Sequence, residues 1–404
     1  MKWKEVRLGE VCSRVCSGGT PKSTNLSYYG GEIPWLNTKE IDFNRIYSTE
    51  KTITESGLSN SSAKWIVPNT VTVAMYGATA GKSCIVKVPM TTNQACCNLT
   101  INEEVADYEF VYYTLKNDYT TLASLANGGA QQNLNAQIIK DYVLQMPSLA
   151  DQHRIAAILS SLDWKIELNN KINADLEEMA QAIFKNWFVD FEPFKDGKFV
   201  DSELGMIPEG WKVGRLDEIA DVVGGSTPSK AKPEYYTQKG IAWLTPKDLS
   251  NHPAVYTSRG EIDITEEGYN STSTKLMPKG TILFTSRAPI GYISIAQNDI
   301  CTNQGFKSLV PKKAGTCFLY CFLKYVTPEI ENKSTGSTFK EASGSLMKSL
   351  QVIMPEQKVF EDFETIVSPL FARIESLEKE NSCLSLLRDT LLPRLMSGEL
   401  EVPE

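Results

Sequence analysis

Two stretches of the chain carry apolar residues at steps of three and four, the spacing that places side chains on one face of a helix. The first stripe consists of Ile155, Leu159, Leu162, Ile166, Leu176, Ala180, Ile183 and Trp187, and the second of Phe363, Val367, Leu370, Ile374, Leu377, Leu384 and Leu391. A helix of this extent is about 55 Å long and cannot bury its stripe alone. The pattern therefore predicts two long helices that pair antiparallel as a coiled coil.

Asparagines interrupt both stripes, and Asn173 and Asn381 occupy equivalent positions in the two predicted helices. A polar pair in the seam can fix the register of a coiled coil at a cost in stability. The alternative is that both side chains face solvent where the helices bend. The pattern by itself favours neither.

The segments that precede the helical stripes have a different pattern. Short apolar runs such as 71–75 and 282–284 alternate with turns rich in Gly, Pro, Asn and Ser. This alternation is typical of β-rich domains with a few helices. The change to helical spacing occurs at Met146-Pro147 in the first half and at Met354-Pro355 in the second.

The chain also matches itself at an offset of about 208 residues. Segment 3–10 returns as 211–218, segment 34–41 as 242–249, and 92–94 as 302–304. Such a long period indicates a duplicated domain rather than a solenoid repeat. We therefore predict an α+β fold in which two homologous β-rich α/β domains, 1–150 and 206–355, are separated by two long antiparallel coiled-coil helical segments, 151–205 and 356–404, with pseudo-two-fold internal symmetry.

Charge is distributed unevenly over these four segments. The 404 residues include 41 basic and 49 acidic ones, for a net charge of -8, but the helical segments hold 6 basic against 11 acidic and 5 against 11. The second β-rich domain has 17 basic and 14 acidic residues. Because attraction to phosphate acts locally, basic patches on the β-rich domains remain compatible with DNA binding. The acidic helices suggest protein partners.

Several classes of protein are disfavoured. No apolar run approaches the roughly 18 to 20 residues needed to cross a bilayer, and the N-terminus lacks the apolar core of a signal peptide, so we expect a cytoplasmic protein without membrane contact. The nine cysteines show no ligand or disulfide spacing and are expected to be reduced thiols. With only two histidines, His153 and His252, no metal site is expected.

No catalytic motif withstands comparison between the two halves. Segment 77–83 resembles a phosphate-binding loop but has three residues between its glycines instead of four, and its counterpart 287–293 lacks the lysine and the serine. The chain has no Pro-Pro pair of the kind found in an amino-methyltransferase loop and no Gly-rich dinucleotide turn. We therefore expect no catalytic residue and no cofactor in this chain.

Polar loops that recur in both halves are the candidate DNA-binding elements. Asn and Gln can bind adenine edges, Arg and Lys can bind guanine, and Lys, Ser and Thr can bind phosphate, although any one such loop is more often a simple turn. The candidates are Lys22, Lys39, Lys82, Asn93, Gln94, Gln131, Gln132, Asn133, Lys230, Lys247, Arg287, Tyr292, Asn303, Gln304 and Lys340. Arg287 is the preferred base-reading residue of the second half, and a surface ion pair is its alternative.

A cluster of aromatic residues follows the first helical stripe. Trp187, Phe188 and Phe191 are candidates for binding a partner protein. The alternative is that they are buried where the chain leaves the helix.

The sequence around this cluster strongly resembles that of a known family. Segments 182–193 and 202–211 are similar to the central region of the specificity (S, HsdS) subunits of type I restriction-modification enzymes. Segment 391–400 resembles the C-terminus of that family, and segment 147–155 with Gln152 resembles its entry into the first helix. The resemblance extends over the whole chain.

This resemblance implies a non-catalytic subunit with two target recognition domains, each of which contacts one half of a split, asymmetric double-stranded DNA sequence. The helices would then set the distance between the halves. It implies two methylation subunits, which use S-adenosylmethionine to methylate adenine, and two restriction subunits for ATP-driven cleavage. The alternative is a protein scaffold or a mimic of such a subunit that does not read DNA. In the second half Phe339-Lys340-Glu341 replaces Gln131-Gln132-Asn133, so base contacts cannot be transferred between the halves.

Overall fold

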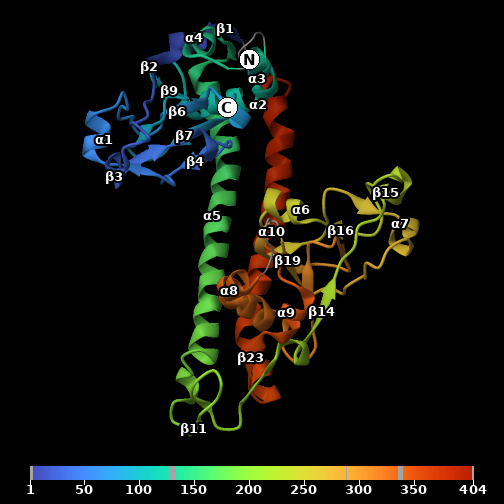
Figure 1. Cartoon of the computed structure of the whole chain (residues 1–404). Coiled ribbons are helices and arrows are strands. Elements are labelled where there is room, and N and C mark those ends of the chain that lie inside the picture. The colour runs from blue at the N-terminus through green and yellow to red at the C-terminus, as the bar shows by residue number, and fades with distance from the viewer. Residues whose placement is uncertain (1–2, 128–132, 288, 335–339, 403–404) are drawn as a thin grey trace. The chain divides into compact units, whose positions relative to one another are not determined.

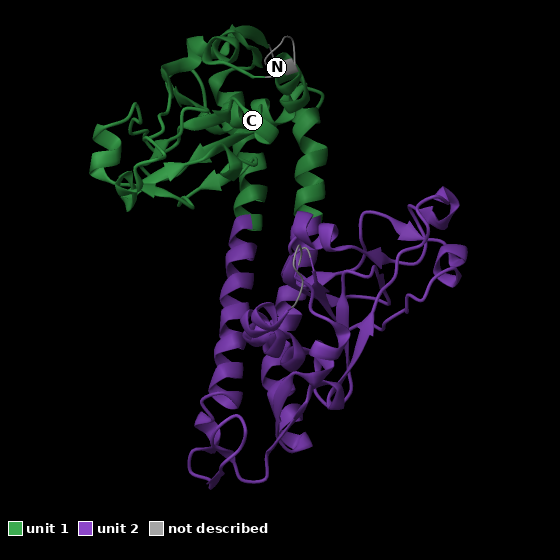
Figure 2. Ribbon diagram, viewed as in Figure 1, with its two compact units in different colours: residues 1–166, 383–404 green, residues 167–382 purple. Residues whose placement is uncertain are grey.

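The computed structural model describes residues 3–127, 133–287, 289–334 and 340–402. The chain forms two compact units (Figure 2), with Met1–Ile166 and Cys383–Glu404 in unit 1 and Glu167–Ser382 in unit 2. Each unit contains a sheet domain and a part of each of two long helices. These helices are α5 (Leu149–Phe188) and α10 (Gln357–Met396), drawn in green and red in Figure 1.

The main sheet of unit 1 has five strands in the order β2-β9-β6-β7-β4. They are β2 (Cys12–Ser17), β9 (Cys96–Ile101), β6 (Val71–Ala74), β7 (Ser83–Val86) and β4 (Arg45–Ile46). Only the edge pair β4 and β7 is parallel among these neighbours. A second sheet consists of β3 (Tyr29–Leu36), β5 (Thr52–Ile53) and β8 (Thr91–Thr92).

The main sheet of unit 2 repeats this order strand for strand, as β14-β22-β19-β20-β17. Its strands are β14 (Ala220–Gly224), β22 (Lys307–Pro311), β19 (Ile282–Ser286), β20 (Ile290–Ala296) and β17 (Tyr256–Thr257). The edge pair β17 and β20 is again parallel. Two further pairs join β15 (Tyr236–Thr237) to β18 (Asp263–Ile264) and β16 (Trp243–Leu244) to β21 (Cys301–Thr302). The predicted duplication is confirmed.

The first and last strands of each domain pair with each other and lead into a long helix. β1 (Lys4–Arg7) is antiparallel to β10 (Val143–Met146), and β13 (Lys212–Arg215) is antiparallel to β23 (Gln351–Met354). Both closing strands end at the methionine of a Met-Pro pair, because proline cannot donate to a strand ladder. The change from strand to helix therefore occurs where the sequence pattern places it.

Shorter helices complete the two domains. Unit 1 contains α1 (Glu55–Ser59), α2 (Tyr108–Asn117), α3 (Tyr119–Ser124) and α4 (Ala136–Asp141). Unit 2 contains α6 (Pro246–Asn251), α7 (Glu266–Asn270), α8 (Thr316–Lys333) and α9 (Gly344–Ser349), together with the hairpin of β11 (Phe199–Val200) and β12 (Ile207–Pro208). The hydrophobic residues of α2 and α8 are mostly buried, so these two helices are core elements.

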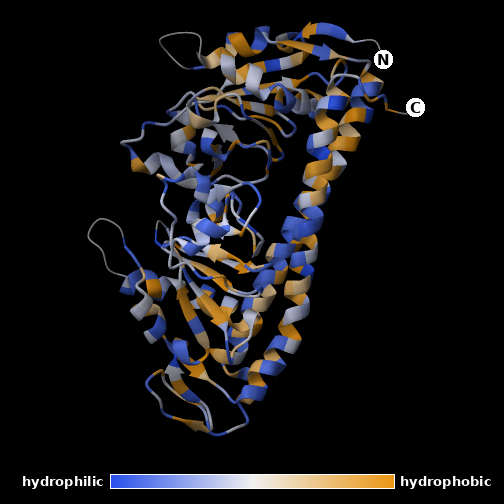
Figure 3. Ribbon diagram, turned by 90° about the vertical axis from the view of Figure 1, so that its right-hand side faces the viewer, coloured by the Kyte–Doolittle hydropathy of each residue, from blue (hydrophilic) through white to orange (hydrophobic). Residues whose placement is uncertain are grey.

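The long helices have 40 residues each, about 60 Å at the usual rise per residue. Apolar and polar positions alternate along both of them in Figure 3. In unit 2, Asn169 of α5 contacts Asn381 of α10, and Phe188 contacts Phe363, so residue numbers rise along one helix as they fall along the other. The predicted antiparallel pairing is confirmed in this unit, where Ile374 and Val367 are buried in the shared core.

The asparagines of the seam pair differently from the expectation. Asn381 accepts a hydrogen bond from Asn169 (2.8 Å) and donates one to Asn170 (2.8 Å). Asn173 is only 9% exposed, and its side-chain oxygen has no hydrogen-bond partner among the described residues. The proposed pair of Asn173 with Asn381 is therefore wrong, and so is a solvent-facing position for Asn173, because antiparallel packing places residue 381 opposite positions 169 and 170.

Some acidic residues of the long helices accept hydrogen bonds from the backbone of the sheet domain of unit 2. The Glu364 carboxylate on α10 accepts hydrogen bonds from the backbone N–H groups of Phe318 (2.8 Å) and Cys317 (3.3 Å) at the start of α8. The Glu378 carboxylate accepts from the backbone of Val255 (2.7 Å) and of Tyr256 (3.0 Å). A carboxylate that caps a helix N-terminus is stabilising, so acidic residues on these helices do not by themselves indicate a protein partner.

Among the described residues, no helix has both the length and the hydrophobicity needed to cross a membrane.

Candidate nucleic-acid interface

The polar loops singled out by the repeat come together at one end of the main sheet in unit 1. The backbone N–H of Gly19 donates to the carbonyl oxygen of Thr92 (2.9 Å), which joins the first loop to the Thr-Asn-Gln turn. The N–H of Met75, just after β6, donates to Ala95 (2.8 Å), and that of Leu134 donates to Met75 (3.0 Å). Loops that lie more than a hundred residues apart in the sequence thus form one surface.

Unit 2 brings its loops together through the same chain of backbone hydrogen bonds. The N–H of Ser226 donates to Thr302 (2.9 Å), that of Ser286 donates to Gly305 (2.8 Å), and that of Ala342 donates to Ser286 (2.9 Å). We call each of these surfaces a loop cluster: residues 18–22, 75–76, 92–95 and 133–134 in unit 1, and residues 225–230, 285–287, 302–305 and 340–342 in unit 2.

Hydrogen bonds from aromatic side chains hold the first loop of each cluster in place. In unit 1, the Trp35 indole donates to the Gly19 carbonyl oxygen (2.9 Å), and the Tyr29 hydroxyl donates to that of Pro21 (2.6 Å). In unit 2, Trp243 donates to Ser226 (3.1 Å) and Tyr236 donates to Pro228 (2.6 Å).

The close approach of the loop to the turn requires glycine. A Cβ atom added to Gly18 would lie 2.2 Å from the carbonyl oxygen of Thr92, and one added to Gly225 would lie 2.1 Å from that of Thr302. The recurring Gly residues therefore have a packing role, as expected where one backbone approaches another.

A side-chain contact between the first loop and the Thr-Asn-Gln turn occurs in both units. The Thr20 hydroxyl donates to the amide oxygen of Gln94, and the Thr227 hydroxyl donates to that of Gln304. We call each contact a Thr–Gln clasp. Both glutamines are exposed, and each keeps its amide N–H₂ group as a donor for an external partner.

Six further candidates from the sequence are also exposed, namely Lys22, Lys39, Asn133, Lys230, Lys247 and Lys340. Lys247 lies 3.9 Å from Glu261, an exposed pair of little energetic value. Lys340 donates weakly to the backbone oxygen of Glu331 (3.3 Å). These side chains remain available to a polyanion.

The two asparagines of the Thr-Asn-Gln turns stabilise those turns through their side-chain oxygens. Asn93 is 8% exposed, accepts from the N–H of Ala95 (3.0 Å) and donates to Asn37 (2.8 Å). The Asn303 side-chain oxygen accepts from the N–H of Gly305 (2.8 Å). A base contact by Asn93 is therefore disfavoured, because both ends of its buried side-chain amide are used within the chain. The turn contact of Asn303 uses only its side-chain oxygen, so a base contact by its amide N–H₂ group stays a prediction.

Arg287 belongs to the loop cluster of unit 2 and already has an acidic neighbour. Its guanidinium lies 3.7 Å from the Glu341 carboxylate, which is also 3.4 Å from the Lys307 ammonium. Arg287 and Glu341 are both only partly exposed. The ion pair that was the alternative for Arg287 is thus present, and it holds the side chain at the surface of the cluster.

Two candidates have side-chain surroundings outside the loop clusters. Lys82 pairs with Asp42 and lies 6.0 Å from the centre of the Phe43 ring. Its counterpart Tyr292 lines a cavity together with Ala254. DNA contacts by Lys82 and Tyr292 therefore stay predictions from the sequence and are not part of the loop clusters. Gln131 and Gln132 lie outside the described residues.

The aromatic cluster at the end of α5 is mostly core. Phe188 is 4% exposed and packs on Phe318 at 4.9 Å between ring centres, and Phe191 is 9% exposed. Trp187 is partly exposed and contacts Phe194 at 5.9 Å. The expectation that Phe188 and Phe191 form a docking surface is corrected, because burying large apolar rings stabilises the fold of unit 2.

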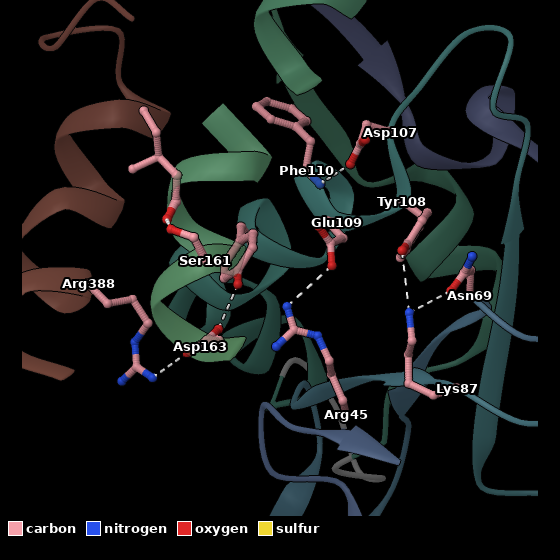
Figure 4. Close-up of polar contacts among 12 residues, drawn as sticks. Arg45, Asn69, Lys87, Asp107, Tyr108, Glu109, Phe110, Ser161, Asp163 and Arg388 are labelled. Carbon is pink, nitrogen blue, oxygen red and sulfur yellow. Dashed lines mark hydrogen bonds and ion pairs between the residues drawn. The ribbon is translucent and has the colours of Figure 1, made fainter. Parts of the chain in front are cut away.

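Unit 1 also holds a buried polar cluster that the sequence pattern did not reveal (Figure 4). The Arg388 guanidinium of α10 donates to Asp163 of α5 (2.7 Å), and Asp163 also accepts from the Tyr113 hydroxyl of α2 (2.6 Å). Nearby, Arg45 pairs with Glu109 at 3.2 Å. Ionic residues scattered over four elements carry no sequence signal until the fold brings them together.

Comparison with known proteins finds one family twice along the chain, once over each sheet domain. The family model described as the type I restriction modification DNA specificity domain matches residues 1–178 and 208–383. The specificity subunit of the type I restriction enzyme MjaIX of Methanocaldococcus jannaschii is 31% identical over all of this chain and 94% of its own length. The HindI specificity subunit of Haemophilus influenzae is 26% identical over 74% of this chain and 79% of its own.

Among solved structures, the S subunit of a type I restriction-modification system from M. genitalium is similar, with a TM-score of 0.59 and 20% identity. The alignment covers 98% of this chain and 96% of that one. At this identity the likeness concerns the fold.

Proposed function

The chain belongs to the family of type I restriction-modification DNA specificity subunits, and from that premise we propose that its two loop clusters read the two halves of a split, asymmetric DNA target. The observation that carries this proposal is the matching pair of clusters, one in each sheet domain. The glycines, the aromatic hydrogen bonds and the Thr–Gln clasp that both clusters share hold the loops in place. The side chains that differ between the clusters provide different chemistry for each half-site.

The exposed groups of the clusters suit a nucleic acid. Lys22 lies two residues after Thr20 and Lys230 three residues after Thr227, so each clasp has a lysine nearby whose ammonium group can bind a phosphate. Gln94 and Gln304 offer amide donors, which can bind a base edge or a phosphate. Arg287 of unit 2 has no basic counterpart at Gly77 of unit 1, so we assign it to sequence reading in one half-site only.

We further propose that the chain is a non-catalytic scaffold for two methylation and two restriction subunits in the cytoplasm. Adenine methylation and ATP-dependent DNA cleavage would be supplied by those subunits. Neither half of the chain presents a repeated nucleotide-binding or methyl-donor motif, which is consistent with this division of labour.

The test is methylome sequencing of a methylation-free host that expresses this chain together with its neighbouring methyltransferase gene. We expect a new split adenine-methylation motif that is absent from a host without this chain. The variant Gln304→Ala should weaken or relax one half of the motif and leave the other half unchanged. A stable complex with the methyltransferase but no motif would contradict the reading role and favour a protein scaffold.

A further inference from the structure

Each unit contains a polar groove next to the last loop of its loop cluster. In unit 1 the groove has a volume of about 390 Å³ and is lined from the end of β1, from β2 and from α4. In unit 2 the groove has a volume of about 530 Å³ and is lined from the end of β13, the end of α8 and α9. We call them the α4 groove and the α9 groove. Each is built within a single unit.

The two grooves occupy equivalent places in the duplicated domains. Arg7 ends β1 and pairs with Val143, and Arg215 ends β13 and pairs with Gln351, so both strand pairs follow the offset of the internal repeat. The helices follow the same offset, and each lies against an edge strand of the main sheet, α4 against β2 and α9 against β14. A groove with this lining therefore belongs to the repeated fold.

An arginine and a lysine line both grooves. Arg7 accompanies Lys140 in the α4 groove, and Arg215 accompanies Lys348 in the α9 groove. Each lysine is the fifth residue of its helix. The two other lining positions that the helices have in common carry different residues, namely Gln137 and Asp141 in α4 and Ser345 and Ser349 in α9. The cations are thus what the two copies have kept in common.

Contacts within the chain do not explain why these cations are shared. Neither lysine has an ion pair among the described residues. The Arg7 guanidinium lies 3.6 Å from Asp141 of α4, whereas that of Arg215 pairs with Asp217 of the turn after β13 at 2.8 Å. The acidic partner thus comes from a different element in each copy, and such exposed pairs contribute little to stability. The shared feature is the positive charge rather than an ion pair.

The lining of both grooves carries more positive than negative charge. Three basic and two acidic side chains line the α4 groove, and three basic and one acidic line the α9 groove. One of the basic residues, Lys333, also pairs with Glu329 on α8 (2.6 Å). Guanidinium binds phosphate through two parallel N–H donors, and ammonium adds a compact charge. An arginine and a lysine in one groove therefore suit a phosphate group.

We propose that each groove binds a backbone phosphate of the DNA next to the half-site that its loop cluster reads. The α9 groove begins where the cluster ends, since Ala342 of the cluster donates to Ser286 and the next residue, Ser343, lines the groove. Phosphates recur about every 3.4 Å along each strand, so a duplex on the cluster carries them past this groove.

DNA also explains the pattern of what is shared and what differs. Phosphates are the same in every DNA sequence, so one pair of cations serves both half-sites, whereas the base-reading loops must differ. An acidic protein segment gives no reason for one site in each domain beside its reading loops. The inference rests on the proposed function and deepens it by assigning sequence-independent phosphate contacts to Arg7, Lys140, Arg215 and Lys348.

The test uses the complex of the full-length chain with the methylation subunit encoded beside it. Its dissociation constant is measured for a duplex with the methylated motif and for a scrambled duplex, between about 50 and 200 mM salt. Lys140→Gln and Lys348→Gln should each weaken binding to both duplexes by about five- to tenfold at about 100 mM salt, and lower the slope of log affinity against log salt by about 0.9. The methylated motif should stay the same.

Controls separate charge from packing. Lys140→Arg and Lys348→Arg keep the charge and should keep the salt slope. Lys171→Gln removes an exposed lysine of α5 that lines neither groove, and it should change neither affinity nor slope. Glutamine retains the Cβ and Cγ atoms that Lys140 places next to Gly9, so wild-type thermal stability is expected.

An unchanged salt slope in the double variant Lys140→Gln, Lys348→Gln, in a protein that unfolds at the wild-type temperature, overturns the proposal. If the glutamine variants are unstable, the arginine variants decide, because arginine variants that lose as much DNA affinity as the glutamine ones also overturn it. Weaker binding of the methylation subunit with an unchanged DNA salt slope would identify an acidic protein surface as the ligand and overturn it too. A methylome without a split motif would instead contradict the proposed function.

Discussion

Neighbouring residues in the Thr-Asn-Gln turn of unit 1 have opposite roles. Asn93 points inward and its amide holds the turn, whereas Gln94 is exposed and joined only to Thr20. The distinction follows from burial, since a buried amide must satisfy its own hydrogen bonds while an exposed one can exchange them for an external partner.

We expect Asn93→Ala to lower the free energy of unfolding by about 1–3 kcal/mol, because it leaves the N–H of Ala95 without its acceptor. Gln94→Ala should change stability by about 0.5 kcal/mol or less. Chemical denaturation of both variants, with DNA affinity measured in parallel, separates the two roles. Equal losses of stability would show that the clasp is structural as well.

The acidic neighbour of Arg287 gives a second residue-scale prediction. Glu341 lies within 4 Å of both Arg287 and Lys307, so Glu341→Gln removes a charge that opposes DNA. We expect tighter DNA binding and a salt dependence steeper by about one phosphate contact. Glu331→Gln is the matched control for Glu341→Gln.

Arg287→Ala should cost about 1–3 kcal/mol at one half-site if Arg287 contacts a base. A loss that is equal on every DNA sequence would identify Arg287 as a phosphate contact.

Among the elements, α8 depends on a neighbour for its N-terminal cap. Its first residues follow Gly315, which offers no side-chain cap, and Glu364 of α10 accepts the free N–H groups of Cys317 and Phe318 instead. A Cβ atom added to Gly315 would lie 2.1 Å from the Glu364 side chain, so a larger residue there would displace the capping carboxylate. In unit 1, by contrast, α2 is capped by its own Asp107 (2.8 Å to the N–H of Phe110).

Glu364→Ala should therefore lower the free energy of unfolding by about 1–2 kcal/mol, the usual cost of a lost cap. Glu361→Ala, one turn away on the exposed face of α10, serves as the control and should have little effect. Urea denaturation checks both variants. If the two changes cost the same, the capping role of Glu364 is wrong.

The pairing of α5 with α10 in unit 1 relies on a buried ion pair. Asp163 and Arg388 have side chains that are 10% and 17% exposed. Asp163→Asn keeps the size of the side chain but leaves the Arg388 charge with only Asp389, so we expect a loss of about 3 kcal/mol. Thermal and urea unfolding measure it, and a double variant with Arg388→Met should recover part of the loss. No recovery would mean that the pair is not coupled.

For the whole molecule, we propose that the length of the paired helices sets the spacer between the two half-sites. Deleting seven residues from each helix, around Asn170 in α5 and at the facing part of α10, shortens them by about 10 Å, or about three base pairs. The expected methylome shows the same half-sites with a shorter spacer. A changed half-site with an unchanged spacer would contradict this role of the helices.

The sequence alone determined the elements and their duplication, because hydrophobic periodicity and repetition are local signals. The stripes, the Met-Pro boundaries and the two β-rich halves are all found where the pattern placed them. The repeat also identified the polar loops, and in the structure these loops lie together at one end of each main sheet. What the sequence could not determine was the direction of a side chain within a loop, which depends on long-range packing.

Tertiary contacts alone therefore separated Gln94 from Asn93, buried Phe188 and Phe191, and turned Lys82 towards Phe43. They also assigned Glu364 and Glu378 to holding the chain's own domain, where charge counting had suggested external partners. The physical reason is that burial and hydrogen bonding are properties of surroundings that the fold assembles from distant segments.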